Sequence, residues 1–130
     1  MNAIHVTILF AGILAFIQCG LTGLVITRRV KAKVSLLDGG DAQLTGRMRA
    51  HGNFTETVPI CLIMMAMLEM QGLSSVWLWV IGSGLTSGRL LHAFCFITQT
   101  FRSGRLIGMV LTIFAMSGLA VLCIGMFFYR

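Results

Sequence analysis

Polar residues with useful chemistry lie on one side of the helix that we predict for the second apolar stretch of the chain. At about 100° per residue, Arg49, Asn53 and Glu56 fall within about 60° of one another. A guanidinium suits a carboxylate, an amide suits a peptide group and a carboxylate suits an ammonium, so this face could bind a small molecule that carries all three. Arg47 and His51 fall on nearly the opposite face. We expect those two residues to meet lipid headgroups or a neighbouring subunit.

A second polar run lies in the third apolar stretch. Arg89 and His92 are three residues apart and share a helical face, and Phe96 follows one turn later. The second and third helices should run antiparallel, which brings these residues to the membrane side of the first polar face. Arg102 and Arg105, in the next connection, reach that side too. The sequence therefore predicts a cationic, hydrogen-bonding cavity near one membrane face, with the carboxylate of the second helix as its deepest acid.

The same charges have a simpler explanation, which the sequence leaves open. Ionisable groups inside a membrane are costly and are candidates for function for that reason. Arg49, Glu56 and Arg89 could nevertheless form a buried ion-pair network that only holds helices together. Polar contacts between membrane helices contribute about 0.6 kcal/mol on average. The two explanations are compatible, because a binding site must also be held rigid.

Four membrane-spanning helices must position these residues. Of the 130 residues, 57% are hydrophobic and 11% are charged, whereas soluble domains carry about 25% charged residues. The mean hydropathy is +0.91, and a spanning helix needs about 20 mostly apolar residues. We expect a single domain, residues 1–130, with helices at approximately 3–27, 44–70, 74–100 and 105–129. The predicted fold is an all-α integral membrane four-helix bundle in up-down-up-down order.

The net charge of +6 is concentrated in two connections between helices. The basic residues of these connections and their borders are Arg28, Arg29, Lys31, Lys33, Arg47, Arg49, Arg102 and Arg105. The positive-inside rule places both connections, and the cavity with them, in the cytoplasm and both termini outside. Basic residues beside a membrane also contact anionic lipid, so we expect no nucleic-acid partner. The first apolar stretch lacks a basic n-region and is too long for a signal peptide.

Small residues and cysteines both indicate helix packing. Glycines recur at a spacing of four in the third and fourth helices, at Gly84 and Gly88 and at Gly104 and Gly108. This spacing allows close approach of helix backbones, although glycine is also common in membrane helices for other reasons. The cysteines are Cys19, Cys61, Cys95 and Cys123. All lie inside predicted helices without a C-x-x-C pair, so we expect packed free thiols rather than a disulfide framework or a metal site.

These polar runs resemble motifs of the MAPEG family, the membrane-associated proteins of eicosanoid and glutathione metabolism. Arg49-Ala50-His51-Gly52-Asn53, followed by Glu56 and Pro59, is similar to the second-helix signature of that family. Gly88-Arg89-Leu90-Leu91-His92 and the later Arg105 resemble its third-helix and fourth-helix motif. The resemblance covers the whole chain. It implies a homotrimer with sites between neighbouring subunits, and a small bacterial member of the inner membrane.

The resemblance also implies roles for single residues. Those implied to bind glutathione or line its pocket are Arg49, Asn53, Glu56, Arg89, His92 and Phe96. Arg105, or Arg102 if the connection shifts in register, would stabilise the thiolate. The chain departs from the pattern at Phe96, where many eukaryotic members have tyrosine, and at Gly52, where some have arginine. Since Phe96 cannot donate a hydrogen bond, ligand orientation and any eicosanoid-specific activity are open.

The expected function is that of a membrane-bound glutathione transferase or peroxidase. Glutathione would serve as co-substrate, and its thiolate would attack a lipophilic electrophile or hydroperoxide from the membrane lipid, with no metal. A non-catalytic scaffold of the same fold is one alternative. A small four-helix transporter is the other, but such transporters rely on a membrane-embedded carboxylate, typically in the first helix, and the first helix here has no Asp or Glu. The sequence does not identify the electrophile.

Overall fold

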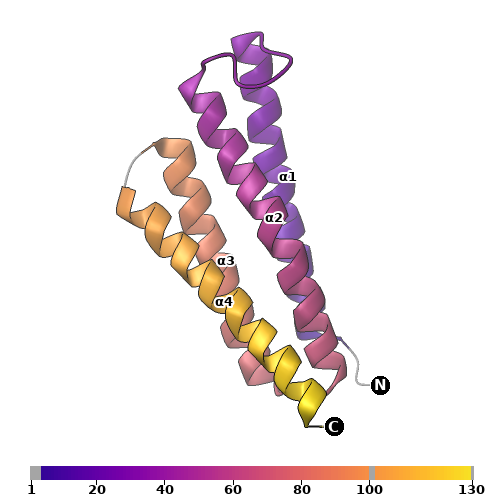
Figure 1. Ribbon diagram of the computed structural model, residues 1–130. Coiled ribbons are helices and arrows are strands. Elements are labelled where there is room, and N and C mark those ends of the chain that lie inside the picture. The colour runs from indigo at the N-terminus through magenta and orange to yellow at the C-terminus, as the bar shows by residue number, and fades with distance from the viewer. Residues whose placement is uncertain (1–3, 100–101, 130) are drawn as a thin grey trace.

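The computed structural model describes residues 4–99 and 102–129, and these form an all-α bundle (Figure 1). The helices are α1 (Val6–Ala32), α2 (Ala42–Met70), α3 (Ser75–Thr98) and α4 (Arg102–Phe128). No strand occurs in the described ranges. All four helices are long and apolar enough to cross a membrane, which confirms the predicted fold class.

Consecutive helices run in opposite directions, as the up-down-up-down order requires. The start of α1 and the end of α4 lie at one end of the bundle, here called the terminal end (Figure 1). The 33–41 loop and the start of α4 lie at the opposite end, here called the loop end. Helix α2 packs against all three other helices. The helix therefore has neighbours on several sides.

The first helix is longer than the sequence predicted. Helix α1 continues to Ala32 rather than ending near Thr27, so the connection is only the 33–41 loop. Basic residues in a last helical turn interact favourably with the helix dipole, and Arg29 and Lys31 occupy that turn. The basic residues that suggested a loop therefore stabilise the last turn of α1 instead. The helix stops at Lys33, whose φ of 54° is left-handed.

Helix α2 begins at Ala42, and Asp41 is its N-cap residue. The Asp41 carboxylate accepts a hydrogen bond from the Leu44 N–H at 2.7 Å and is paired with Arg28 at 2.6 Å. This pair ties the end of α1 to the start of α2. The fourth helix also begins earlier than expected, because Arg102 is helical rather than part of a connection.

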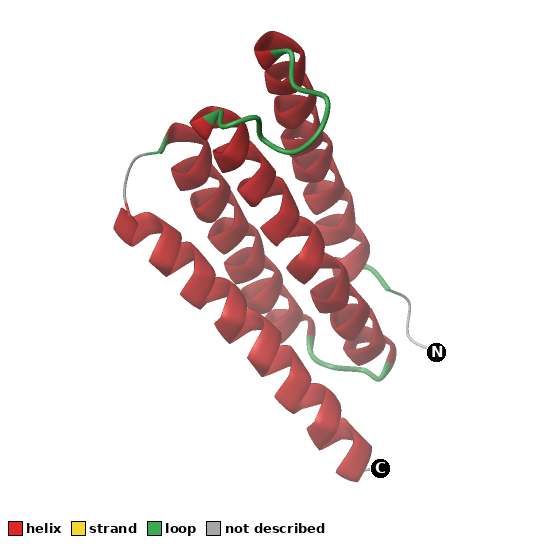
Figure 2. Ribbon diagram, turned by 45° about the horizontal axis from the view of Figure 1, so that its top comes forward, coloured by secondary structure: helices red, strands yellow, loops and turns green. Residues whose placement is uncertain are grey.

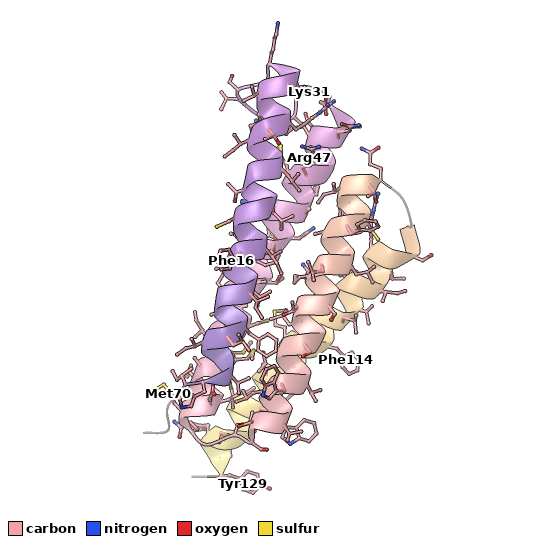
Figure 3. The ribbon with its side chains drawn as sticks, turned by 180° about the vertical axis from the view of Figure 1, so that it is seen from behind. Phe16, Lys31, Arg47, Met70, Phe114 and Tyr129 are labelled. Carbon is pink, nitrogen blue, oxygen red and sulfur yellow. The ribbon has the colours of Figure 1, made fainter. Side chains whose placement is uncertain are left out.

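The interior of the bundle is apolar and so is most of its outside. The largest fully buried side chains include Leu14, Leu44, Met65, Leu68, Leu78, Leu85 and Leu119. Phe16 and Phe114 point away from the bundle near the middle of its length and are 82% and 78% exposed (Figure 3). Exposed aromatic groups at this level fit contact with lipid tails or with another subunit.

Two glycines set the contact between α3 and α4. A Cβ added at Gly108 would lie 2.7 Å from the Gly88 carbonyl oxygen and 2.8 Å from the His92 Cβ. The backbones therefore approach too closely for any side chain there. Gly84, in contrast, faces open space, so Gly88 and Gly108 carry the packing role that was predicted for the spaced pairs.

The terminal end is closed by an acid that the sequence analysis did not single out. Glu69, near the end of α2, is only 7% exposed. Its carboxylate accepts hydrogen bonds from the backbone N–H groups of His5, Val6 and Thr7, at 2.9, 2.7 and 2.8 Å. These groups belong to the first turn of α1, where backbone donors lack helical partners and the dipole favours a negative charge. Glu69 therefore fastens α1 to α2.

Candidate functional site

The polar face of α2 lines a hollow of about 480 Å³ at the loop end. This first hollow is lined by Leu37, Asp38, Thr45, Met48, Arg49, Gly52, Asn53 and Glu56. Positions 45, 49, 52, 53 and 56 share one side of a helix because they are spaced by three or four residues. The structure thus places the predicted glutathione residues of the second helix along one cavity. Its volume is within the range of about 300–1,000 Å³ that is usual for small-molecule sites.

The side chains of Arg49, Asn53 and Glu56 in the first hollow are accessible rather than paired with one another. Arg49 and Glu56 are exposed and Asn53 is half-buried. Among the side chains that the structure describes, Arg28 and Asp41 form an ion pair, and neither Arg49 nor Glu56 takes part in one. The alternative of an Arg49–Glu56–Arg89 network is therefore not formed within this chain.

A second hollow, of about 510 Å³, lies between α3 and α4. It is lined by His92, Phe96, Ser103, Arg105, Leu106 and Met109. The Arg105 guanidinium carbon lies 4.6 Å from the centroid of the Phe96 ring, and the Phe96 and His92 ring centroids are 4.9 Å apart. The aromatic ring of Phe96 thus holds Arg105 by a cation–π contact. Arg105 Nε donates to the Cys95 carbonyl oxygen at 3.3 Å, and its terminal nitrogens make no hydrogen bond within the described residues.

Arg89 lies between the two hollows, buried at 3% exposure. Its Nη1 donates to the Asn53 carbonyl oxygen and its Nη2 to the Gly108 carbonyl oxygen, both at 3.3 Å. Its Nε is buried without a partner in the described residues. The guanidinium therefore joins the helix of the first hollow to the helix of the second. The cavity that the sequence predicted as one is two hollows with this arginine between them.

The 33–41 loop brings an ionised acid to the first hollow. The Thr45 hydroxyl donates to Asp38 Oδ2 at 2.8 Å, and the Gly40 N–H donates to Asp38 Oδ1 at 3.2 Å. These hydrogen bonds, the one from Thr45 above all, lower the pKa of Asp38. The pKa of Asp41 is likewise lowered, chiefly by its hydrogen bond from Arg28. The first hollow thus has a carboxylate at its loop end in addition to Glu56.

Arg47 and His51 hydrogen-bond to α1, a neighbour that the sequence analysis did not assign to them. Arg47 Nη1 donates to the Leu24 carbonyl oxygen at 2.7 Å. His51 Nε2 lies 2.9 Å from the Gln18 amide nitrogen and 3.2 Å from the Thr22 hydroxyl. The face opposite the first hollow is therefore the contact surface with α1, since α1 offers polar groups at the matching level.

Several residues of the site could not be assigned from the sequence. Leu37 and Asp38 lie on a loop, where no periodicity predicts which side chains meet a helix. Thr45 and Gly52 could have been found by extending the predicted face of α2 by a turn and filling its gaps. The side chain of Arg102 lies outside the described residues. Arg105 is described and lines the second hollow.

The motifs on this framework match a known family. A model of the MAPEG family matches residues 7–125. The chain belongs to the MAPEG family. The resemblance drawn from the motifs of the second and third helices is confirmed, and the MAPEG match includes every residue that lines the two hollows.

Two curated proteins are similar to this MAPEG chain. Inner membrane protein YecN of Escherichia coli strain K12 is 35% identical over 78 residues. YecN of Escherichia coli O6:H1 strain CFT073 matches with the same identity over the same length. The similarity spans 60% of this chain and 60% of each relative, which is less than two thirds of their length. No solved structure matches the chain significantly.

Proposed function

We propose that this integral membrane protein is a glutathione-dependent transferase or peroxidase, which activates the glutathione thiolate for attack on lipophilic electrophiles or hydroperoxides. The observation that carries the proposal is the alignment of Arg49, Asn53 and Glu56 along one accessible hollow. Membership of the MAPEG family supports it. The name of the YecN relatives supports a place in the inner membrane.

Glutathione has the groups that the first hollow can bind. It carries two carboxylates, one amine and two amides besides its thiol. Arg49 can bind a carboxylate in bidentate fashion, Asn53 can bond a peptide group and Glu56 can accept from the ammonium. No metal takes part in this scheme.

Arg105 would activate the thiol. A thiol titrates near pH 8.5, and the thiolate is the nucleophile. Arg105 lies in the first turn of α4, where the helix dipole adds partial positive charge, and its terminal nitrogens are available to an anion. Lowering the thiol pKa by about 2 units requires roughly 2.7 kcal/mol of differential stabilisation. A partly desolvated arginine–thiolate pair can provide this.

The reaction is then a simple displacement. The thiol proton passes to water, and the sulfur attacks an electrophilic carbon. With a chlorinated nitroaromatic, a C–S bond forms, the C–Cl bond breaks and chloride leaves with its electron pair. Leu106 and Met109 line the second hollow, are 58% and 45% exposed, and belong to a helix that is apolar enough to lie in lipid. An electrophile dissolved in lipid could therefore reach Arg105 without crossing water.

The assembly and orientation follow from the same proposal. We expect a homotrimer with sites between neighbours, so that glutathione in the first hollow can place its sulfur near an Arg105. We expect the loop end to face the cytoplasm because it carries the basic residues. Cysteines introduced at Lys33 or Ser103 should escape labelling from outside the cell, and ready labelling at either position would overturn this orientation.

Of the two acids of α2, only Glu56 keeps the transporter alternative open. Glu69 is occupied by three backbone donors, and Glu56 lies in the accessible first hollow. A non-catalytic scaffold would have the same fold as the proposed enzyme but no turnover, so an activity assay distinguishes the two.

The test uses purified full-length protein, glutathione and a chlorinated nitroaromatic. We expect turnover and an ultraviolet thiolate absorbance that titrates below pH 8.5. Arg105→Ala should raise the thiol pKa and slow turnover at neutral pH, with part of the rate returning as pH rises. Arg102→Ala is the matched control. If glutathione binds without turnover, the protein is a scaffold; if only Arg102→Ala shifts the titration, Arg102 is the activating residue.

A further inference from the structure

Arg29 contacts the wall of the first hollow without lining the hollow itself. It lies in the last turn of α1 and is half-buried. Its Nη1 donates to the Leu37 carbonyl oxygen at 2.8 Å and to the Ser35 carbonyl oxygen at 3.4 Å. Its Nη2 lies 3.4 Å from the Met48 sulfur. Both Leu37 and Met48 line the first hollow, so a single guanidinium joins α1, the loop and α2 at that wall.

The loop needs such a contact because its backbone is strained at the same place. Leu37 has a φ of +55°, in the left-handed region that residues with a bulky side chain rarely occupy. Such a conformation persists only where surrounding contacts hold it. The carbonyl oxygen of Leu37 itself accepts the hydrogen bond from Arg29. The Leu37 side chain is 79% exposed, so its own packing does not hold it. The loop that carries it spans from α1 to α2 (Figure 2).

We propose that Arg29 is a positioning residue for the first hollow, which holds the 33–41 loop so that Leu37 and Met48 form an apolar wall against the bound ligand. The inference rests on the proposed function, because it takes the ligand to be glutathione. The planar fork of an arginine is required, since one nitrogen bonds the loop carbonyls and the other contacts α2. The wall would retain the ligand, so its loss should act mainly on dissociation.

Two measurements on purified full-length protein test the proposal. One is the dissociation constant and dissociation rate of glutathione, and the other is amide hydrogen exchange of the 33–41 loop without ligand. The variants are Arg29→Gln, Arg29→Lys and Leu37→Asn. Lys31→Gln is the matched control, because Lys31 is an exposed cation on the same turn and makes no hydrogen bond or ion pair within the described residues.

We expect Arg29→Gln and Arg29→Lys to weaken glutathione binding about fivefold through faster dissociation, and to speed exchange of the loop about tenfold. Leu37→Asn should weaken binding with little change in exchange, since asparagine tolerates the left-handed conformation. Lys31→Gln should change neither. Full rescue by Arg29→Lys would mean that charge alone matters and would overturn the fork argument.

The remaining outcomes separate the two proposals. Unchanged loop exchange in Arg29→Gln would overturn the positioning role whatever the ligand. Unchanged binding in Leu37→Asn, with weak binding in Arg29→Gln, would overturn the wall and indicate direct contact of Arg29 with the ligand. If wild-type protein binds no glutathione, the proposed function fails and so does the wall against that ligand. If Arg29→Gln still speeds exchange of the 33–41 loop in that case, Arg29 holds the loop for another reason.

Discussion

Helix α2 carries one acid near its terminal end and one at its middle, and the surroundings of the two carboxylates are opposite. Glu69 is buried, and three backbone donors saturate its carboxylate at 2.7–2.9 Å. Glu56 is exposed in the first hollow. Arg89, between the hollows, is as buried as Glu69 but has only two bonds, both at 3.3 Å. A buried charge that the backbone satisfies fully has a structural role, whereas a poorly satisfied one retains capacity to bind a ligand.

The largest effect should come from the saturated acid. Glu69→Ala removes three charge-assisted hydrogen bonds, each worth about 1.5–3 kcal/mol, so we expect the free energy of unfolding to fall by about 3 kcal/mol or more. Unfolding in mixed detergent micelles measures this. Glu69→Gln should lose less, because its amide oxygen can still accept. Equal stability of Glu69→Ala and wild type would contradict the structural role of the acid.

The accessible acid should show the opposite pattern. Glu56→Gln should weaken glutathione binding by roughly 1.5–3 kcal/mol, the range for hydrogen bonds to charged groups. Its stability should match wild type because the side chain is exposed. Calorimetric titration with glutathione measures the affinity. A loss of assembly with retained affinity would show that Glu56 joins helices instead.

Arg89 should combine features of both. Replacing a poorly satisfied buried charge by an apolar group is often neutral for stability. We therefore expect Arg89→Met to change the free energy of unfolding by less than about 1 kcal/mol but to weaken glutathione binding about tenfold, or about 1.4 kcal/mol. A large loss of stability would place Arg89 with Glu69 among the structural charges.

The smallest effect should be the response of the loop end to acid. The pKa of Asp41 is lowered in the folded protein, so its contribution to stability is present above its unfolded pKa of about 3.9. That contribution is lost as pH falls through the folded pKa. Melting curves from pH 7 down to about pH 2, below the unfolded pKa, should show a smaller loss for Asp41→Asn than for wild type. Identical pH dependence in both proteins would show that the Arg28–Asp41 pair contributes nothing measurable to stability.

The sequence predicted the parts of the molecule that follow from periodicity. The apolar stretches fixed the four helices, and the 100° repeat placed Arg49, Asn53 and Glu56 together. Glu69 was missed because its partners are backbone groups of α1, which leave no trace in residue types. Leu37 was missed because loop conformation depends on contacts made by Arg29. The bonds of Arg47 and His51 to α1 were not predicted because a helical face alone does not show which helix packs against it.

The contact between Gly88 and Gly108 limits how this sequence can vary. Gly108 lies one turn after Arg105 and touches the backbone of His92. A methyl group at Gly108 would force α3 and α4 apart at the level where Phe96 holds Arg105. In a saturation-mutagenesis screen, position 108 should therefore tolerate almost no substitution, and position 88, where an added Cβ would lie 3.0 Å from the Leu111 Cβ, should tolerate small residues only. Under the proposed function, such variants would resemble catalytic defects in their phenotype, although neither glycine has a side chain with which to touch a substrate.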